Sequence, residues 1–178
     1  MRYNFLLIIV VLSLGTFPAF PATIPATGTI DVFFTPSGGA TAAIVNEIQA
    51  ARKEILVQAY SFTSTPIAKA LLEAHKRGVK VVAVLDKSQR TERYTSATFL
   101  SNAGVTVLID DKHAIAHNNK IIIIDRETLI TGSFNFTQAA ELKNAENLLI
   151  FHDNNPLVDK YIRNFEDHKG HSEPYQGK

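Results

Sequence analysis

The sequence predicts an α/β fold in which one mixed β-sheet is sandwiched between helices. Three observations support this. Short apolar, β-branched runs alternate with segments whose apolar residues recur at helical spacing. Turn and cap residues separate them, such as Pro36-Ser37-Gly38-Gly39 and Thr63-Ser64-Thr65-Pro66. Two strands joined by only three residues, Asp125-Arg126-Glu127, must be antiparallel, so the sheet is mixed.

The expected elements follow from these patterns along the chain. Strands are predicted over residues 29–34, 55–60, 79–86, 105–109, 120–124, 128–131 and 145–152. Helices are predicted over residues 40–54, 66–77, 97–103, 137–144 and 156–169. The last helix presents Leu157, Ile162 and Phe165 on its apolar side. One domain over residues 29–168 results, followed by a flexible tail at 169–178.

The composition limits the possible functions. Lys and Arg total 18 against 17 Asp and Glu. Without residues 1–22, which contribute only Arg2 to these charges, the chain has 17 of each. A globally basic nucleic-acid binder is therefore excluded, and any affinity for polyanions must be local. The absence of cysteine excludes disulfides and thiolate metal sites.

The first 22 residues have the layout of a secretory signal. Arg2 precedes an apolar core at residues 5–14, and small residues and prolines follow. A membrane anchor is the alternative, but that core is shorter than the roughly 20 residues that a span needs. We expect cleavage between residues 19 and 26 and export to a periplasm or the medium, without stable membrane association afterwards.

The stretch HNNKIIIIDRETLITGSFNF places polar side chains around an aliphatic strand. Ser133 and Asn135 are two residues apart and point the same way in an extended chain. Lys120 and Asp125 are five apart and point to opposite faces, which favours a structural role for Asp125 at the turn. A histidine, a lysine and oriented donors together suit an anion with several oxygens, because histidine can attack phosphorus or protonate a leaving oxygen.

The pattern Lys120-x4-Asp125-x6-Gly132-Ser133-x-Asn135 resembles the HKD motif of the phospholipase D superfamily. The flanking segments VFFTPSGGA, 57–86 and AAELKNAENLLI are also similar to that family, so the resemblance covers about residues 30–165. The chain is most similar to short, exported bacterial endonucleases with a single HKD motif. The resemblance implies a phospholipase D-like fold and a phosphodiesterase that uses a covalent phosphohistidine and neither metal nor cofactor. Because the family builds one site from two motifs, it also implies a homodimer.

The same resemblance assigns roles to individual residues. His117 would attack phosphorus, while His117 of the partner subunit would protonate the leaving oxygen and later activate water. Lys120 and Asn135 would hold the non-bridging oxygens with help from Ser133. Glu146 would accept a hydrogen bond from the histidine and fix its tautomer. Asp125 completes the motif and is included among the catalytic candidates. Ser133 and Asn135 as a turn and helix cap, and Glu146 as a solvated acid, are the structural alternatives.

One feature departs from the family pattern. The family spacing is His-x-Lys, whereas His117-Asn118-Asn119-Lys120 contains one residue more. Residues three apart on a regular strand face opposite ways, so a bulge must absorb the extra residue if both side chains are to reach one phosphate. Asparagine tolerates the left-handed conformation that a bulge can require. The alternative is a site broken by the insertion.

Basic residues near the predicted strand 79–86 have two interpretations. They are Lys76, Arg77, Lys80, Lys87, Arg90 and Arg93. They form either a solvated helix end and loop or a rim that contacts phosphates, in which Lys87, Arg90 and Arg93 bind substrate. Contacts of that kind carry no sequence information. The first hypothesis is therefore a nonspecific endonuclease acting on DNA and RNA. The alternatives are a phospholipid phosphodiesterase and a non-catalytic phosphate-binding module.

Overall fold

An eight-stranded mixed sheet forms the centre of the computed structural model, which describes residues 23–92, 95–116 and 120–177. The strand order is β1-β7-β6-β5-β2-β3-β4-β8. The strands are β1 (Thr29–Phe34), β2 (Glu54–Ala59), β3 (Lys80–Asp86), β4 (Thr106–Asp110), β5 (Lys120–Ile124), β6 (Thr128–Gly132), β7 (Asn147–His152) and β8 (Glu173–Pro174). The predicted mixed sheet is confirmed.

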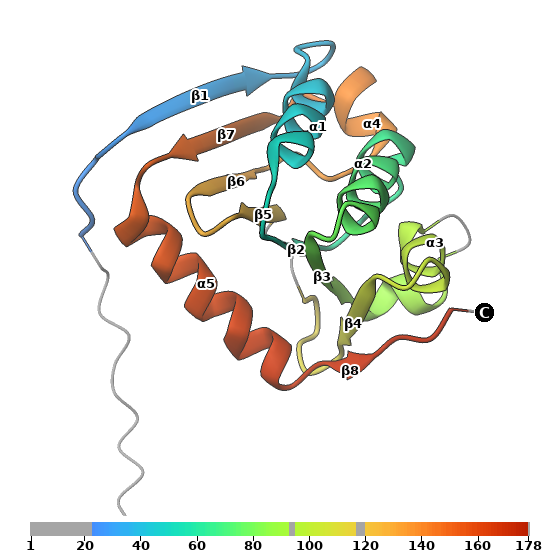
Figure 1. The fold of residues 1–178 in the computed structure, drawn as a ribbon. Coiled ribbons are helices and arrows are strands. Elements are labelled where there is room, and N and C mark those ends of the chain that lie inside the picture. Colours follow the sequence, from blue (N-terminus) through green and yellow to red (C-terminus); the bar gives the residue numbers. More distant parts are fainter. Residues whose placement is uncertain (1–22, 93–94, 117–119, 178) are drawn as a thin grey trace, which may run out of the picture.

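Helices cover both faces of this sheet, as Figure 1 shows. They are α1 (Ala40–Ala50), α2 (Thr65–Lys76), α3 (Ser96–Asn102), α4 (Gln138–Leu142) and α5 (Asn155–Gly170), with a 3-10 turn η1 (Lys87–Arg90). The helices α1 to α4 share one apolar core with the sheet, and α5 packs alone on the other face. None of the helices within the described part of the chain is long and apolar enough to span a bilayer.

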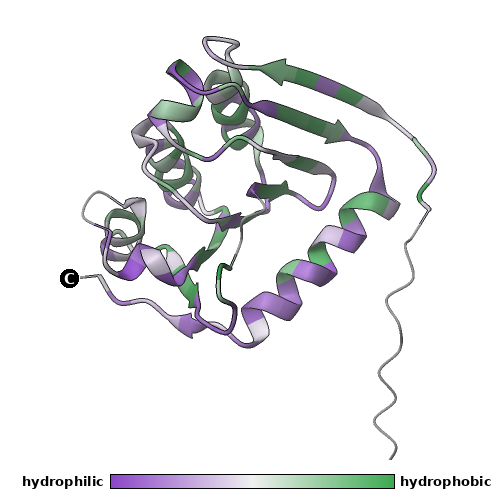
Figure 2. Ribbon diagram, turned by 180° about the vertical axis from the view of Figure 1, so that it is seen from behind, coloured by the Kyte–Doolittle hydropathy of each residue, from purple (hydrophilic) through white to green (hydrophobic). Residues whose placement is uncertain are grey.

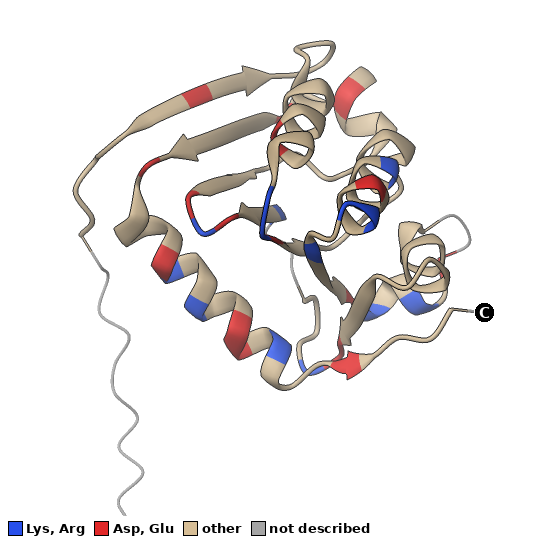
Figure 3. Cartoon of the chain, in the orientation of Figure 1, with Lys and Arg blue, Asp and Glu red and all other residues tan. Residues whose placement is uncertain are grey.

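The closing helix α5 is amphipathic, and its apolar side contacts the sheet. Val158, Ile162 and Phe165 are buried against residues of β2, β3, β5 and β6, with Leu157 partly buried beside them. Figure 2 shows the resulting alternation of apolar and polar residues along α5, and Figure 3 shows charged residues distributed along it. The strand β5, with a helix-covered core on each face, is buried at all five positions.

Strand directions bring several strand ends to one edge of the sheet. The strands β2, β3 and β4 are parallel, whereas β5 is antiparallel to β2, and β5, β6, β7 and β1 continue antiparallel. At one edge of the sheet, several strands therefore end where others begin. The strands β1, β2, β3, β4 and β6 end there, and β5 and β7 begin there. We call this side of the sheet the Lys120 edge, and the opposite side the Asp125 edge.

The C-terminal segment does not form the predicted flexible tail. Its strand β8 pairs antiparallel with β4. Tyr175 is buried, its backbone N–H donates to Val107 O at 2.9 Å, and its hydroxyl lies 2.8 Å from Thr98 Oγ1. The prediction of a flexible tail is therefore corrected. The composition of this segment indicates disorder, but the buried Tyr175 and the two-residue strand β8 fix it on the sheet.

Candidate active site

Three neighbouring strands bring Lys120, Ser133 and Glu146 together at the Lys120 edge. Lys120, the first residue of β5, pairs with Gly132 at the end of β6, and Gly132 pairs with Leu148 of β7. Ser133 follows Gly132 directly, and Glu146 lies just before β7. Sequence positions up to 26 residues apart therefore become neighbours through the register of β5, β6 and β7 alone.

Ser133 is fixed by a closed set of hydrogen bonds. Its hydroxyl donates to Glu146 Oε2 at 2.6 Å and accepts from the Asn147 N–H at 3.0 Å. Its own N–H donates to Asn147 Oδ1 at 2.9 Å, and Asn144 Nδ2 donates to Glu146 Oε1 at 3.0 Å. The Ser133 hydroxyl therefore donates its proton to the Glu146 carboxylate, and only its oxygen can accept a further hydrogen bond. It could donate to a bound ligand only if the ligand displaced Glu146.

Gly132 permits the close approach of β6 and β7 at this point. Its φ of +148° is rarely adopted by L side chains, and a Cβ there would collide with the backbone carbonyl of Asn147. The backbone conformation therefore explains why the motif has glycine followed by serine at this point. Glycine lets the chain turn, and the following Ser133 N–H reaches Asn147.

Lys120 is a buried cation beside a carboxylate. Only 7% of the residue is exposed. Burial lowers the pKa of the Lys120 ammonium, and the charge of Glu146 opposes that shift by raising it. A partly desolvated ammonium binds an anion strongly, because few water molecules must be displaced and the effective dielectric is low.

Asn135 lies beyond Ser133 on the segment that leads into α4. Its side-chain oxygen is buried and, within the part of the chain that the structure describes, makes no hydrogen bond. An unpartnered buried amide oxygen costs about 1–3 kcal/mol. The amide can recover this cost by binding a donor, or by rotating to present its N–H2 to an anion.

The chain just before His117 is anchored to the sheet. Asp86, buried at the end of β3, accepts the Ala116 N–H at 2.6 Å with Oδ2 and caps η1 through the Ser88 N–H. Lys87 Nζ donates to the His113 carbonyl at 2.9 Å. His117, Asn118 and Asn119 lie outside the described residues, and the predicted bulge lies there with them.

Asp125 lies at the opposite end of β5 from Lys120, on the Asp125 edge. It accepts the N–H groups of Arg52, Lys53 and Glu54 at 2.8, 2.7 and 3.0 Å. Burial raises the pKa of the Asp125 carboxyl, but these hydrogen bonds outweigh that effect and lower it below its ordinary value. The inclusion of Asp125 among the catalytic candidates is therefore corrected to the structural role that its spacing indicated.

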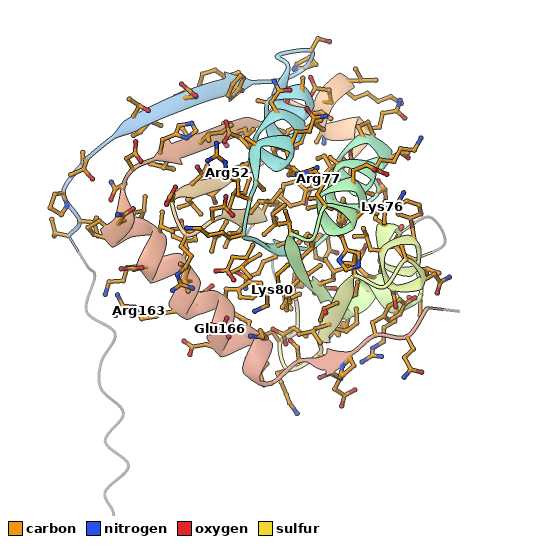
Figure 4. The ribbon with its side chains drawn as sticks, in the orientation of Figure 1. Arg52, Lys76, Arg77, Lys80, Arg163 and Glu166 are labelled. Atoms are coloured by element: carbon orange, nitrogen blue, oxygen red, sulfur yellow. The ribbon has the colours of Figure 1, made fainter. Side chains whose placement is uncertain are left out.

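The basic residues predicted as one rim divide between the two edges. Lys76, Arg77 and Lys80 lie away from the Lys120 edge (Figure 4), and Arg77 donates to the last carbonyls of α1. For these three the structural interpretation applies.

The other members of the predicted rim follow β3 on the Lys120 edge. Besides the contact of Lys87 with His113, Arg90 pairs with Glu173 at 3.2 Å. Arg93 lies outside the described residues. The structure therefore shows intramolecular partners for Lys87 and Arg90.

Three residues at this edge were not singled out from the sequence. Asn144 and Asn147 hold Glu146 and Ser133, and Asp86 holds Ala116. The asparagines flank Glu146 in the run KNAEN, which was a usable signal. The sequence gave no such signal for Asp86, because an aspartate at the end of a strand is also an ordinary helix cap.

A buried ammonium, a serine held on a carboxylate and a buried amide lie at one sheet edge, a set of groups whose chemistry suits an anion with several oxygens. A family model described as "Cardiolipin synthase, PLD-like domain" matches residues 44–169. The chain belongs to this family of the phospholipase D superfamily, a class of phosphodiesterases.

Individual relatives agree with this assignment. A protein of Rickettsia felis named phospholipase D is 43% identical over 140 residues, which is 79% of this chain and 69% of that protein. Human mitochondrial cardiolipin hydrolase is 33% identical over 122 residues, 68% of this chain and 46% of that protein.

Solved structures show the same fold. Nuc of Salmonella typhimurium, described as a phospholipase D family member, aligns with a TM-score of 0.80 at 35% identity. The alignment covers 85% of this chain and all of Nuc. NucT of Helicobacter pylori aligns with a TM-score of 0.76 at 22% identity, over 84% of this chain and all of NucT.

Proposed function

We propose that this protein is an exported, metal-independent, nonspecific endonuclease that cleaves DNA and RNA through a covalent phosphohistidine. The observation that supports it most directly is the placement of Lys120 beside Ser133 and Glu146 at the edge where His117 follows the anchored Ala116. Lys120 and Asn135 bind the non-bridging oxygens, and Glu146 orients the histidine. His117 attacks phosphorus, the P–O bond to the leaving strand breaks, and water later releases the phosphate from His117.

The site is shared between two copies of the chain. One motif supplies a single histidine, whereas the reaction needs a nucleophile and a separate proton donor for the leaving oxygen. Apolar side chains exposed at the Lys120 edge suit such a contact: Phe34, Ile115 and Leu142 are 68%, 60% and 52% exposed. A two-fold axis there would bring both histidines to one phosphate.

Nucleic acid is the substrate that we propose, because the motif and its flanking segments resemble those of short single-motif endonucleases and the chain aligns with the whole of Nuc, a phospholipase D family member, at 35% identity. Arg90 is available to a phosphate backbone, since its ion pair with Glu173 is a surface contact of the kind that contributes little. Binding through such contacts would be nonspecific and would weaken as salt rises.

A phospholipid is the second candidate substrate. The Rickettsia relatives are named phospholipase D, and the exposed Phe34, Ile115 and Leu142 would also suit contact with a lipid surface. The site chemistry is the same for both substrates, because both present a phosphodiester.

The deciding experiment is nicking of supercoiled plasmid by purified protein lacking residues 1–22, at 25 °C in excess EDTA. His117→Ala is the matched variant, and hydrolysis of cardiolipin vesicles is assayed in parallel. Cleavage of plasmid by the parent alone supports the proposal. Hydrolysis of vesicles without cleavage of plasmid moves the assignment to a lipid, and full activity of His117→Ala would overturn the mechanism.

Two further outcomes separate the remaining alternatives. If the parent binds DNA without turnover and Lys120→Ala abolishes that binding, the protein is a phosphate-binding module whose insertion has broken catalysis. Export, which rests on residues 1–22 alone, is tested by fractionating cells that produce the full-length chain. Protein found only in the cytoplasm with residues 1–22 intact would contradict it.

A further inference from the structure

Four side chains capable of binding a metal ion converge at the far end of the Lys120 edge. Asp110 is the last residue of β4 and fully buried, and His113 follows it in the next loop. His168 lies in the last turn of α5, and His171 immediately follows that helix. Their ligand atoms all lie within 4.8 Å of one another.

The distances centre on one carboxylate oxygen. Asp110 Oδ2 lies 2.7 Å from His168 Nδ1, and 3.2 Å from both His113 Nδ1 and His171 Nε2. The other oxygen, Oδ1, accepts the Lys112 N–H at 3.0 Å, which holds the carboxylate in place. His113 Nδ1 also lies 3.3 Å from Oδ1, so three imidazole rings and one backbone N–H surround a single buried carboxylate.

We propose that Asp110, His113, His168 and His171 form a tetrahedral Zn²⁺ site with three nitrogen ligands and one oxygen ligand. Zinc bonds to histidine nitrogen and carboxylate oxygen are about 2.0–2.2 Å long, which puts neighbouring ligand atoms of a tetrahedron roughly 3.3–3.5 Å apart. The separations from Asp110, 2.7 and 3.2 Å, are shorter than these values, and the four ligand atoms lie within 4.8 Å of one another, so the side chains would rotate as the ion binds.

The site is structural rather than catalytic. Four protein ligands complete the coordination of zinc, and catalytic zinc sites keep a position open for water. Asp110 also lies apart from Lys120: the register aligns Lys120 with Ala59, Leu85 and Ile109 across three strand spacings, or roughly 14 Å. A zinc ion here would have no open position for a phosphodiester, so the chemical step itself would not involve the metal.

The ion would join two neighbouring parts of the chain to a third part that is distant in sequence. They are the end of β4, the loop toward β5 that carries His113, and the junction of α5 with β8. His113 lies four residues before His117, so the same ion would fix the chain that leads into the active site. This site was not expected from the sequence, because Asp110-x-x-His113 and His168-x-x-His171 are unremarkable pairs until the fold brings them together.

The test is metal binding by the untagged protein without residues 1–22, independent of any activity. Protein dialysed against a chelator is titrated with Zn²⁺ by calorimetry, and its Tm is measured with and without the metal. We expect one Zn²⁺ per chain and, at about a 100-fold excess of free metal over Kd, a rise in Tm of roughly 5–10 °C.

Variants identify the ligands. His113→Gln changes the most exposed ligand and is the least disruptive of the fold, and His171→Ala removes a second. Each should weaken zinc binding at least tenfold, whereas the control His75→Gln, on α2, should bind as the parent does. Failure of the parent to bind, or parental affinity in both ligand variants, would overturn the proposal. Neither result bears on cleavage of phosphodiesters, which the His117 and Lys120 variants test.

Discussion

The Ser133 hydroxyl lies 2.6 Å from Glu146 Oε2, and this short hydrogen bond joins the motif to the strand that follows it. The same carboxylate raises the pKa of Lys120 against the lowering effect of burial. Glu146 therefore acts on two members of the site at once. Its hydrogen bond fixes the Ser133 hydroxyl in place, and its negative charge favours the protonated form of the Lys120 ammonium.

Replacing Glu146 by Gln should separate these two effects. Glutamine can still accept the Ser133 hydroxyl but carries no charge, so the pKa of Lys120 falls further. Because Lys120 is active as a cation, activity is lost as pH rises through that lowered pKa. We expect kcat/KM to fall about tenfold or more at alkaline pH, with the alkaline limb of the pH profile moved to lower pH. The matched control is Glu127→Gln, an exposed acid at the Asp125 edge; an unchanged profile in Glu146→Gln would contradict the electrostatic role.

Lys120→Met should separate function from stability. Methionine has a similar length and no charge to desolvate, so the variant should fold with a Tm equal to or above that of the parent. Cleavage should fall by at least 100-fold, because the non-bridging oxygens lose their cation. Thermal melts and initial rates measure the two quantities, and Lys80→Met, on an exposed position of β3, is the control. A variant that loses Tm and activity together would indicate a structural lysine.

Most of the fold could be predicted from local sequence patterns. One prediction that was wrong concerned which residues lie at the same edge of the sheet. The run KIIII predicted β5 correctly because all five positions are buried. The predicted basic rim included residues that do not share an edge of the sheet. Lys80 and Lys87 are close in sequence but lie at opposite ends of the seven-residue strand β3, roughly 20 Å apart. Only strand direction and pairing show which residues share an edge.

The active-site residues on β5 and β6 were predictable because the hairpin register connects them. Lys120 and Ser133 are adjacent through one turn of three residues. The histidine cluster around Asp110 was not predictable, because His168 reaches it through the packing of α5 on the sheet. Order in the C-terminal segment likewise depends on Tyr175 filling a space beside β4, which no local pattern indicates.

Asp125→Asn should destabilise the fold in a pH-dependent way. The pKa of Asp125 is lowered in the folded state, so its contribution to stability is present above the unfolded pKa of about 3.9. That contribution is lost as pH falls through the folded pKa. We expect a loss of about 1–3 kcal/mol in the free energy of unfolding at pH 7, shrinking below pH 4. Urea unfolding of the variant and of the exposed control Asp159→Asn measures this; a penalty independent of pH would contradict the assignment.

Deletion of Asn118 tests how the chain accommodates its extra residue. The deletion restores the two-residue spacing at which His117 and Lys120 share a face of an extended strand. We expect plasmid cleavage to be kept or raised, provided that Ala116 remains anchored on Asp86, because the shortened segment no longer has to absorb a bulge. If the parent cleaves and the Asn118 deletion does not, while melting at the same temperature, then a native bulge is required to present His117.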